Sequence, residues 1–145
     1  MSADLAKVQR YIEKVELFKG LTPEEVIKIV SSGMTMQCVQ NEVIFFKGTV
    51  GSQMYVVLGG KVGVFGDNDK IIATLTTGDM FGEMALVSKE PRSATVRALE
   101  TSKLFVLTES AFDKLLTKRV AIRLLLNIIH TLSHRLKASN AQRLG

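Results

Sequence analysis

The residue types best suited to chemistry lie in one irregular stretch, residues 78–93, which reads GDMFGEMALVSKEPRS. The stretch is too long for a hairpin turn, and long ordered loops in compact domains are usually functional. Gly82 permits a tight backbone turn, and residues 83–86 can form one helical turn whose free N–H groups attract an anion. Arg92 follows Pro91, which fixes the backbone, and its planar fork of donors suits a phosphate. The stretch therefore favours phosphate binding, although a surface loop with a solvated arginine would have a similar sequence.

Short runs rich in β-branched and aromatic residues surround this stretch and indicate strands. Such runs occur at residues 34–39, 42–46, 54–58, 61–65, 71–75, 94–98 and 103–107. Glycine and polar turns separate the runs, and Asn68 and Asp69 can adopt the left-handed conformations that a hairpin loop requires. Because no helical run lies between the strands, the pattern predicts an antiparallel β jelly-roll barrel, also called a double-stranded β-helix.

Helical segments flank the strands, over about residues 3–33 before them and 108–145 after them. In the first segment, Thr22 is expected to cap a helix with Pro23 at its first position and Glu25 closing a capping box. In the last segment, Thr108 is expected to cap a short helix. A longer helix then has an apolar face formed by Ala121, Leu125, Ile128, Leu132 and Leu136. The predicted fold is mainly β with N-terminal and C-terminal helices, in a single domain over residues 1–145 with the barrel at 34–107.

The composition is that of one soluble globular domain. Of 145 residues, 46% are hydrophobic and 23% are charged, which argues against a disordered chain. The single cysteine, Cys38, cannot form a disulfide within the chain and fits a small buried residue in a strand. No apolar run approaches the roughly 20 residues of a membrane helix, and the charged N-terminus lacks the apolar stretch of a signal peptide. These features predict a cytoplasmic protein without a membrane segment.

The net charge of +5 raises the question of nucleic-acid binding. No acidic residue follows Asp113, and the basic residues after it are spaced along the terminal helix. Such spacing is typical of the solvated face of an amphipathic helix. Because neither a second helix-turn-helix segment nor interleaved aromatic residues accompany these charges, no direct nucleic-acid contact is expected.

Two segments carry a more specific signal. FGEMAL at residues 81–86 and PRSATVRA at residues 91–98 resemble the phosphate-binding cassette of cyclic-nucleotide-binding domains, which places the cassette at residues 81–98. That family includes kinase regulatory subunits, nucleotide-gated channels and the catabolite activator protein. The resemblance covers nearly the whole chain, and upstream glycines such as Gly48, Gly51 and Gly60 resemble the turns of the family's barrel.

The resemblance implies a role for each matching residue. Arg92 would pair with the cyclic phosphate, and Glu83 would accept a hydrogen bond from the ribose 2′-hydroxyl. With the main-chain N–H groups of the cassette included, the implied binding residues are Phe81, Gly82, Glu83, Met84, Ala85, Arg92, Ser93 and Ala94. Ser93 leaves the purine open, because a hydroxyl there accompanies cyclic GMP in some members and cyclic AMP in bacterial-type members. We favour cyclic AMP as the ligand, and we expect no further cofactor and no metal.

In the family, the last helix covers the base as a lid. One matching of the sequence SHRLKASN places Ser139 and Asn140 near the purine edge, while another places Ser133 there. Arg135 is a further candidate, because a guanidinium can stack on a purine ring. The sequence does not decide among these lid residues.

The expected function is that of a ligand-sensing regulatory module with no catalytic residue. Relatives continue into DNA-binding, kinase or channel segments, so this chain would act on an effector in trans, buffer its ligand or belong to a larger protein. A homodimer through the terminal helices is also expected from the apolar residues there, namely Leu125, Ile128, Ile129, Leu132 and Leu136.

Two other functions are weighed against this one. The first is a degenerate jelly-roll scaffold or interaction protein that binds no nucleotide, although Gly82, Glu83 and Arg92 are all present. The second is a small metal-dependent jelly-roll enzyme. His130 and His134 lie one helical turn apart, but neither lies in a predicted strand and no third metal ligand is evident.

Overall fold

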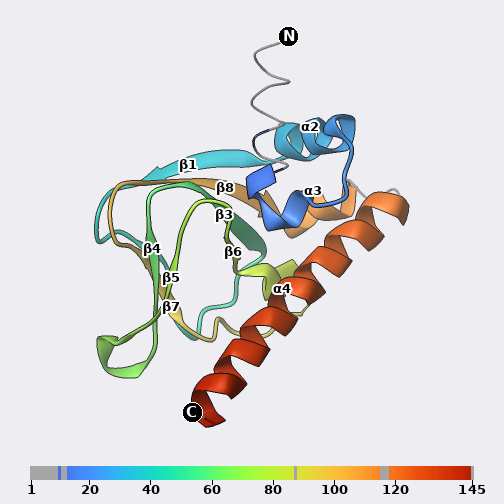
Figure 1. The fold of residues 1–145 in the computed structure, drawn as a ribbon. Helices are drawn as coiled ribbons and strands as arrows, with labels where there is room; N and C mark the ends of the chain where they lie inside the picture. Colours follow the sequence, from blue (N-terminus) through green and yellow to red (C-terminus); the bar gives the residue numbers. More distant parts are fainter. Residues whose placement is uncertain (1–9, 11–12, 87, 115–117, 145) are drawn as a thin grey trace.

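The computed structural model describes residues 10, 13–86, 88–114 and 118–144. These residues form two four-stranded antiparallel sheets, with strand orders β1-β8-β3-β6 and β2-β7-β4-β5. The strands are β1 (Met34–Cys38), β2 (Val43–Phe45), β3 (Gln53–Gly59), β4 (Val62–Phe65), β5 (Ile71–Leu75), β6 (Met80–Phe81), β7 (Thr95–Ala98) and β8 (Ser102–Thr108). Figure 1 shows the strands curving around a common interior, with helices along one side. The predicted mainly β jelly roll with flanking helices is confirmed.

One strand was absent from the prediction. β6 pairs with β3 through Tyr55 opposite Phe81 and Val56 opposite Met80. A two-residue strand shows no alternating pattern in the sequence, so only its pairing with β3 defines it. This short strand leads directly into the cassette and fixes where the cassette begins.

The helical elements are η1 (Glu16–Phe18), α2 (Pro23–Ser32), η2 (Asp67–Asp69), η3 (Glu83–Leu86), α3 (Glu109–Lys114) and α4 (Lys118–Leu144). Before α2, the Thr22 hydroxyl accepts a hydrogen bond from the Glu25 N–H, and the Glu25 carboxylate accepts one from the Thr22 N–H. Before α3, the Thr108 hydroxyl accepts a hydrogen bond from the Ala111 N–H at 3.0 Å. Both predicted caps are therefore confirmed, while the predicted helix start near residue 3 lies outside the described residues.

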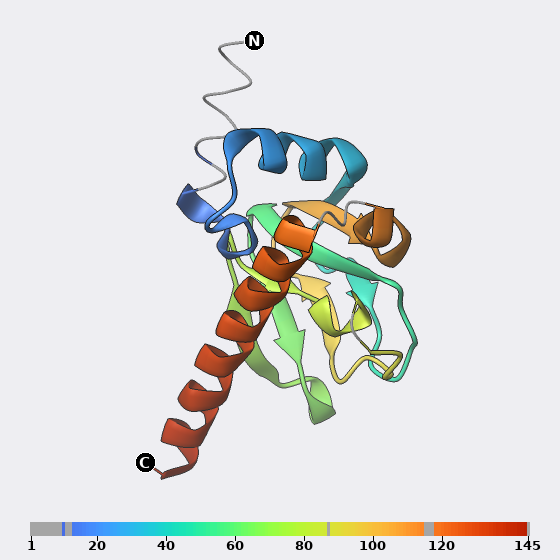
Figure 2. The same ribbon diagram turned by 90° about the vertical axis from the view of Figure 1, so that its right-hand side faces the viewer.

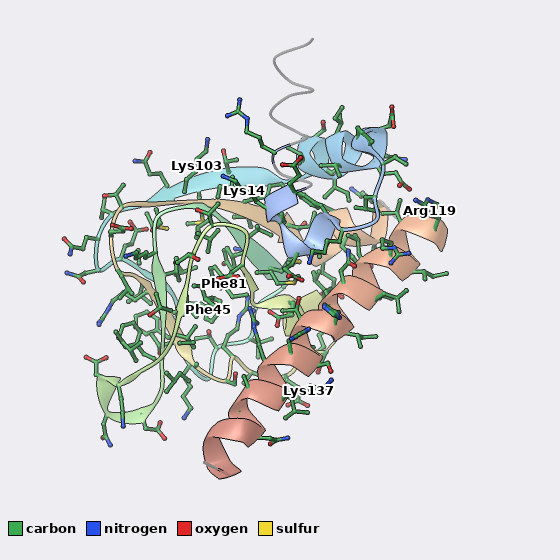
Figure 3. All side chains as sticks on the ribbon, in the orientation of Figure 1. Lys14, Phe45, Phe81, Lys103, Arg119 and Lys137 are labelled. Carbon is green, nitrogen blue, oxygen red and sulfur yellow. The ribbon has the colours of Figure 1, made fainter. Side chains whose placement is uncertain are left out.

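Strand β3 separates two apolar cores because its side chains alternate between the two faces of the sheet. Met54 and Val56 face η1, α2, α3 and α4, whereas Tyr55 and Val57 face the space between the two sheets. Figure 3 labels Phe45 and Phe81 within that inner space. Burial on both faces explains why β3 is apolar over four consecutive residues rather than alternating apolar and polar ones.

The long helix α4 packs along one side of the barrel, and its C-terminal turns extend past the sheets in two perpendicular views (Figures 1 and 2). Leu124 and Ile128 are buried against the helix-side core, and the Asn127 amide donates hydrogen bonds to the Leu17 and Lys19 carbonyls. Of the apolar face predicted from the sequence, Ile128 is buried in the chain's own core, whereas Leu136 is 62% exposed. Leu124 and Ile128 define the buried side of the helix, and Leu136 lies about 120° around the helix from Leu124. Of the described helices, none has both the length and the apolarity to cross a membrane.

Candidate functional site

The cassette surrounds a cavity of about 500 Å³ between the sheets and α4. We call it the cassette cavity. Its wall includes all eight cassette residues that the sequence resemblance implicated, namely Phe81, Gly82, Glu83, Met84, Ala85, Arg92, Ser93 and Ala94. The structure thus brings together two segments, 81–86 and 91–98, that the sequence separates by four residues.

The first cassette segment forms the predicted helical turn. Gly82 adopts a φ of +73°, a conformation that strains residues with a side chain, and η3 follows it over Glu83–Leu86. The Ala85 N–H donates a hydrogen bond to the Gly82 carbonyl at 3.2 Å. This geometry turns the Glu83 side chain into the cavity wall, where the residue is only 4% exposed.

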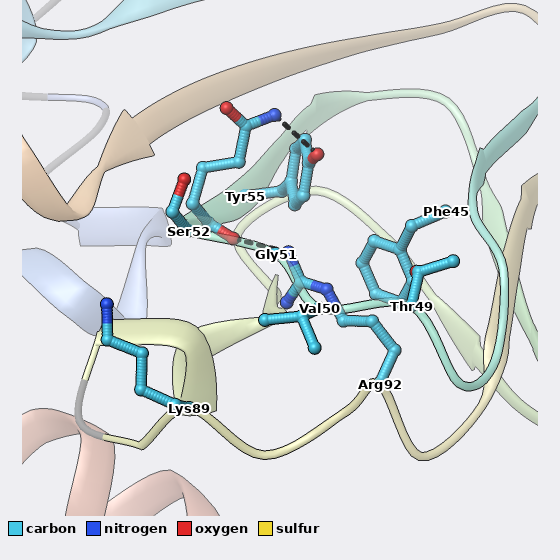
Figure 4. Close-up of a pocket in the computed structure, with 9 residues that line it drawn as sticks. Phe45, Thr49, Val50, Gly51, Ser52, Tyr55, Lys89 and Arg92 are labelled. Atoms are coloured by element: carbon cyan, nitrogen blue, oxygen red, sulfur yellow. Dashed lines mark hydrogen bonds between the residues drawn. The ribbon is translucent and has the colours of Figure 1, made fainter.

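The second segment places the guanidinium of Arg92 beside the same cavity. Its Nη1 donates to the Gly82 carbonyl at 3.0 Å, and its Nη2 donates to the Gln53 carbonyl at 2.8 Å. The group lies over the Phe45 ring, 4.1 Å from the centroid (Figure 4). Its Nε is buried and has no hydrogen-bond partner among the described residues. Burial lowers the pKa of the Arg92 guanidinium below its ordinary value, while the nearby Tyr55 and Glu83 act in the opposite direction. An arginine so placed still carries its positive charge at neutral pH.

The turn between β2 and β3 holds Arg92 in place. The Arg92 N–H donates to the Thr49 carbonyl at 2.7 Å, and the Gly48 N–H donates to the Arg92 carbonyl at 2.8 Å. A Cβ atom added at Gly51 would lie 2.3 Å from Arg92 Nη2, so only glycine fits there without moving the guanidinium. The sequence indicated Gly51 as a barrel turn, but its contact with Arg92 was not predicted. A smaller cavity of about 340 Å³ opens on this side of Arg92 (Figure 4).

Much of the remaining wall is apolar and was not predicted from the sequence. It is formed by Phe45, Val64, Ala73, Leu75 and Val96, which come from four different strands. Most of these residues belong to or pack against the inner core, where the Tyr55 and Phe81 rings stack at 4.9 Å. The alternation of inward and outward residues in the predicted strands was the available signal, but it does not say which inward residues line a cavity.

Helix α4 contributes the last part of the wall through Leu132 and Arg135. Arg135 Nη1 donates to Glu83 Oε1 at 3.1 Å, and Arg135 Nη2 donates to the Met80 carbonyl. The other predicted lid residues, Ser133, Ser139 and Asn140, are exposed on α4 and do not line the cavity. Their contact with a base stays a prediction.

The two histidines of α4 contact each other, with ring centroids 4.5 Å apart. Both are exposed. In the part of the chain that the structure describes, no group of three or more histidine, cysteine or acidic side chains could hold a metal ion.

Known proteins with similar sequences share this region. Residues 35–119 match the family profile described as "Cyclic nucleotide-binding domain". The cyclic AMP receptor protein of Thermus thermophilus is 38% identical over 95 residues, which are 63% of this chain and 44% of that protein. A cAMP-dependent protein kinase regulatory subunit of Hypocrea atroviridis is 32% identical over 108 residues, which are 74% of this chain and 23% of that protein. The chain thus spans less than half the length of these curated relatives.

Solved structures show the same architecture. A cyclic nucleotide-binding domain from Methylobacillus flagellatus superimposes with a TM-score of 0.85 at 25% identity, covering 98% of this chain and 84% of that one. The catabolite activator protein of Thermus thermophilus superimposes with a TM-score of 0.77 at 31% identity, covering 88% of this chain and 61% of that one. From its sequence match, its jelly roll and its assembled cassette, we conclude that this chain belongs to the cyclic nucleotide-binding domain family.

Proposed function

We propose that this chain binds a cyclic mononucleotide in the cassette cavity and acts as a non-catalytic, ligand-sensing regulatory module. The observation that carries the proposal is the buried Arg92 guanidinium, whose Nε lacks an acceptor among the described residues beside a cavity. A buried donor without a partner is costly, and an acceptor from a ligand would remove that cost.

Arg92 would bind the cyclic phosphate. A cyclic phosphodiester carries one negative charge, and hydrogen bonds to a charged group in a partly dry site are stronger than neutral ones. The carbonyls of Gly82 and Gln53 already engage two of the five N–H groups, so three remain for phosphate oxygens. Phe45 lies beneath the guanidinium and keeps it in plane for this contact.

The rest of the ligand would occupy the remaining wall. Glu83 would accept a hydrogen bond from the ribose 2′-hydroxyl, which favours ribonucleotides over their 2′-deoxy analogues. The apolar residues of the strands, with Leu132 of α4, would cover the purine. Leu132 and Arg135 of α4 line the cavity, so a bound ligand would favour one position of this helix over others. The position of the helix would then signal that the ligand is bound.

We propose cyclic AMP as the preferred ligand, with cyclic GMP as the alternative. Support for cyclic AMP comes from relatives named as a cyclic AMP receptor protein and as cAMP-dependent kinase regulatory subunits, and from a neighbour named as PKAR CBD2 with Sp-2Cl-cAMPS bound. A relative named as a cGMP-dependent protein kinase, from Plasmodium berghei, is 33% identical over 95 residues. Ser93 lines the cavity but is compatible with both purines.

Calorimetric titration with cyclic AMP, cyclic GMP and cyclic dinucleotides tests the proposal. We expect saturable binding of at least one cyclic mononucleotide and no binding of the dinucleotides. A thermal-shift screen in which no cyclic nucleotide changes the unfolding temperature would favour the degenerate scaffold instead.

We also propose a homodimer, through a surface of α4 that differs from the one expected from the sequence. Ile128 is 2% exposed in the chain's own core and cannot face a second copy. Ile122, Leu126, Ile129 and Leu136 are 47–62% exposed on the opposite side of α4, and with Ser133 they follow the 4-3-4-3 spacing of a coiled-coil seam. Light scattering at two concentrations tests the dimer, and Leu126→Lys should yield a monomer.

A further inference from the structure

The smaller cavity beside Arg92, of about 340 Å³, lies next to the turn between β2 and β3 (Figure 4). We call it the turn cavity. It shares Phe45 and Arg92 with the cassette cavity. The lining residues that belong to the turn cavity alone are Thr49, Val50, Gly51, Ser52, Gln53, Tyr55 and Lys89. The Arg92 side chain is therefore part of the wall of two cavities.

The two cavities differ in the charge of their walls. The cassette cavity has two basic residues, Arg92 and Arg135, and two acidic residues, Glu83 and Glu90. The described residues that line the turn cavity include two basic ones, Arg92 and Lys89, and no acidic one. Two positive charges without an acidic residue in the wall attract an anion, and they do so more strongly where the wall excludes water.

The two cations of the turn cavity are not committed to strong ion pairs. Lys89 Nζ lies 3.5 Å from Glu109 Oε2, but the Lys89 side chain is 82% exposed, and such exposed pairs contribute little. Arg92 is buried and, among the described residues, forms no ion pair. An anion in the turn cavity could therefore bind both cations without breaking a strong ion pair.

Uncharged donors accompany the two cations. The Tyr55 hydroxyl accepts a hydrogen bond from the Gln53 amide at 2.6 Å, which leaves its own O–H for another acceptor. Within the part of the chain that the structure describes, the Ser52 hydroxyl has no hydrogen-bond partner. The main-chain N–H groups of Val50, Gly51 and Ser52 donate to no carbonyl of the described residues. Successive free N–H groups in a turn are a common feature of anion sites.

We propose that the turn cavity is a second anion site, which binds a phosphate group with two negative charges. The group is either free phosphate or the monoester of a small molecule. Such a group carries up to two negative charges at neutral pH and so matches the two cations, whereas a cyclic phosphodiester carries only one. The volume of the cavity is at the lower end of the range for small-molecule sites, which suits a compact ligand.

A phosphate in the turn cavity would oppose binding of the cyclic nucleotide. Both anions would draw on the Arg92 guanidinium, and like charges on either side of it would repel each other. The effect is reciprocal, because each ligand must lower the affinity for the other by the same factor. This antagonism rests on the proposed function, since it requires a cyclic nucleotide in the cassette cavity. The anion site itself does not rest on it.

The anion site is tested by nuclear magnetic resonance of the ¹⁵N-labelled chain without nucleotide. Inorganic phosphate and glycerol 2-phosphate are titrated in turn at neutral pH, with sodium chloride keeping the ionic strength constant. We expect saturable shifts of the Val50, Gly51 and Ser52 N–H signals, with a dissociation constant of about 1 mM. The ligand that binds more tightly identifies free phosphate or a phosphate monoester as the source of the group.

Three variants locate the bound phosphate. Lys89→Gln removes the cation that lines only the turn cavity, and it should weaken phosphate binding about fivefold. Ser52→Asp places a carboxylate in the wall and should abolish the binding. Lys47→Gln is the matched control, because Lys47 is a half-exposed cation of the same turn that lines neither cavity. It should leave the affinity for phosphate unchanged, and the spectra show whether each variant has folded.

The antagonism is tested by calorimetric titration of cyclic AMP at increasing concentrations of phosphate, again at constant ionic strength. Because both ligands fit on the chain at once, the apparent dissociation constant should rise about five- to tenfold and then reach a plateau. In Lys89→Gln the same plateau should need about fivefold more phosphate. In Ser52→Asp the affinity should not depend on phosphate. The phosphate-free affinity of each variant is its own reference.

Phosphate that competes directly for the cassette cavity gives a different result. The apparent dissociation constant would then rise without a plateau, the shifts would appear at Gly82 and Ala85, and Lys89→Gln would have no effect. Any of these results would overturn the anion site, as would the absence of shifts in the turn. An affinity for cyclic AMP that saturating phosphate leaves unchanged would overturn the antagonism. A chain that binds phosphate in the turn cavity but no cyclic nucleotide would overturn only the proposed function, so the failures are distinguishable.

Discussion

Arg92 and Arg97 lie close together in the sequence and have similar local surroundings. The Arg92 guanidinium lies 4.1 Å from the centroid of the Phe45 ring, and that of Arg97 lies 4.2 Å from the centroid of the Phe65 ring. In both residues Nε is buried without a partner among the described residues. By these local measures the two arginines are equally good candidates for an anion site.

The difference between them lies in what surrounds each guanidinium. Arg92 lines the cassette cavity, whereas Arg97 does not. The Nη1 atom of Arg97 lies 3.9 Å from the exposed Asp69 carboxylate. Val96 and Ala98 of β7 point into the inner core, so the strand alternation places Arg97 on the outer face. A stacked cation with an unpaired N–H is therefore not sufficient for a binding site. The site also needs a cavity and a second polar group, which Arg92 has in Glu83.

The largest contrast is expected from lysine at the two positions. Arg92→Lys keeps the charge but loses the planar fork, and we expect a loss of about 2–3 kcal/mol, roughly 30- to 150-fold in affinity for cyclic AMP. Arg97→Lys should change that affinity by less than about twofold, because the residue lies outside the cavity. Calorimetry measures both. Equal losses in the two variants would contradict the distinction between the arginines.

Two glycines extend the comparison, one next to Arg92 and one next to the Phe65 ring under Arg97. A Cβ atom at Gly51 would meet Arg92 Nη2 at 2.3 Å, and one at Gly63 would meet the Phe65 ring at 2.8 Å. We expect Gly51→Ala to displace the Arg92 guanidinium from the Gln53 carbonyl and to weaken cyclic AMP binding about tenfold. Gly63→Ala should cost about 1–3 kcal/mol of folding free energy through overpacking and leave the affinity unchanged. Urea denaturation and titration separate the two effects, and a Gly63→Ala chain with weakened binding would be evidence against this partition.

Removing the aromatic ring that lies under each arginine is expected to have a smaller effect. Phe45→Leu removes the ring beneath Arg92, and we expect affinity to fall by about 0.5–1 kcal/mol, roughly two- to fivefold. Phe65, which is 3% exposed, has the same relation to Arg97. Phe65→Leu should lower the unfolding temperature without changing affinity, as differential scanning calorimetry and titration can show. The comparison fails if the Phe65 variant is the one that binds poorly.

The smallest effect is expected at Asp69. Its carboxylate is 79% exposed and 3.9 Å from Arg97, so Asp69→Asn should change the folding free energy by less than about 0.5 kcal/mol. Cyclic AMP affinity should equal that of the wild-type chain. A measured loss above about 1 kcal/mol in urea denaturation would mean that the Arg97 pair contributes more than an exposed ion pair normally does.

Local signals in the sequence determined most of the elements. All seven predicted runs are strands, both caps form as expected, and Asn68 and Asp69 have φ values of +61° and +60°. Residues 83–86 form the expected helical turn. These features depend on neighbouring residues, since caps, turns and alternating burial are set within a few positions of the chain.

The eight binding residues implied within the cassette could also be named from the sequence, and all eight line the cavity. The residues that complete its wall could not be named. Leu75 and Val96 share their inward direction with other core residues of their strands, and the apolar face predicted on α4 joined the buried Ile128 to Leu136, which is 62% exposed. An error of one position on a helix rotates a side chain by about 100°, so a face cannot be fixed without the surface against which it packs.

The sequence by itself determined the strand runs, the helix caps, the cassette and the arginine that we propose for the phosphate. Only the tertiary structure decided that β6 exists, that Gly51 leaves room for the Arg92 guanidinium, and that Arg135 of α4 meets Glu83 of η3. Each of these depends on segments that are distant in the chain. Such contacts are set by how whole elements pack against one another, and no local pattern of residues encodes that packing.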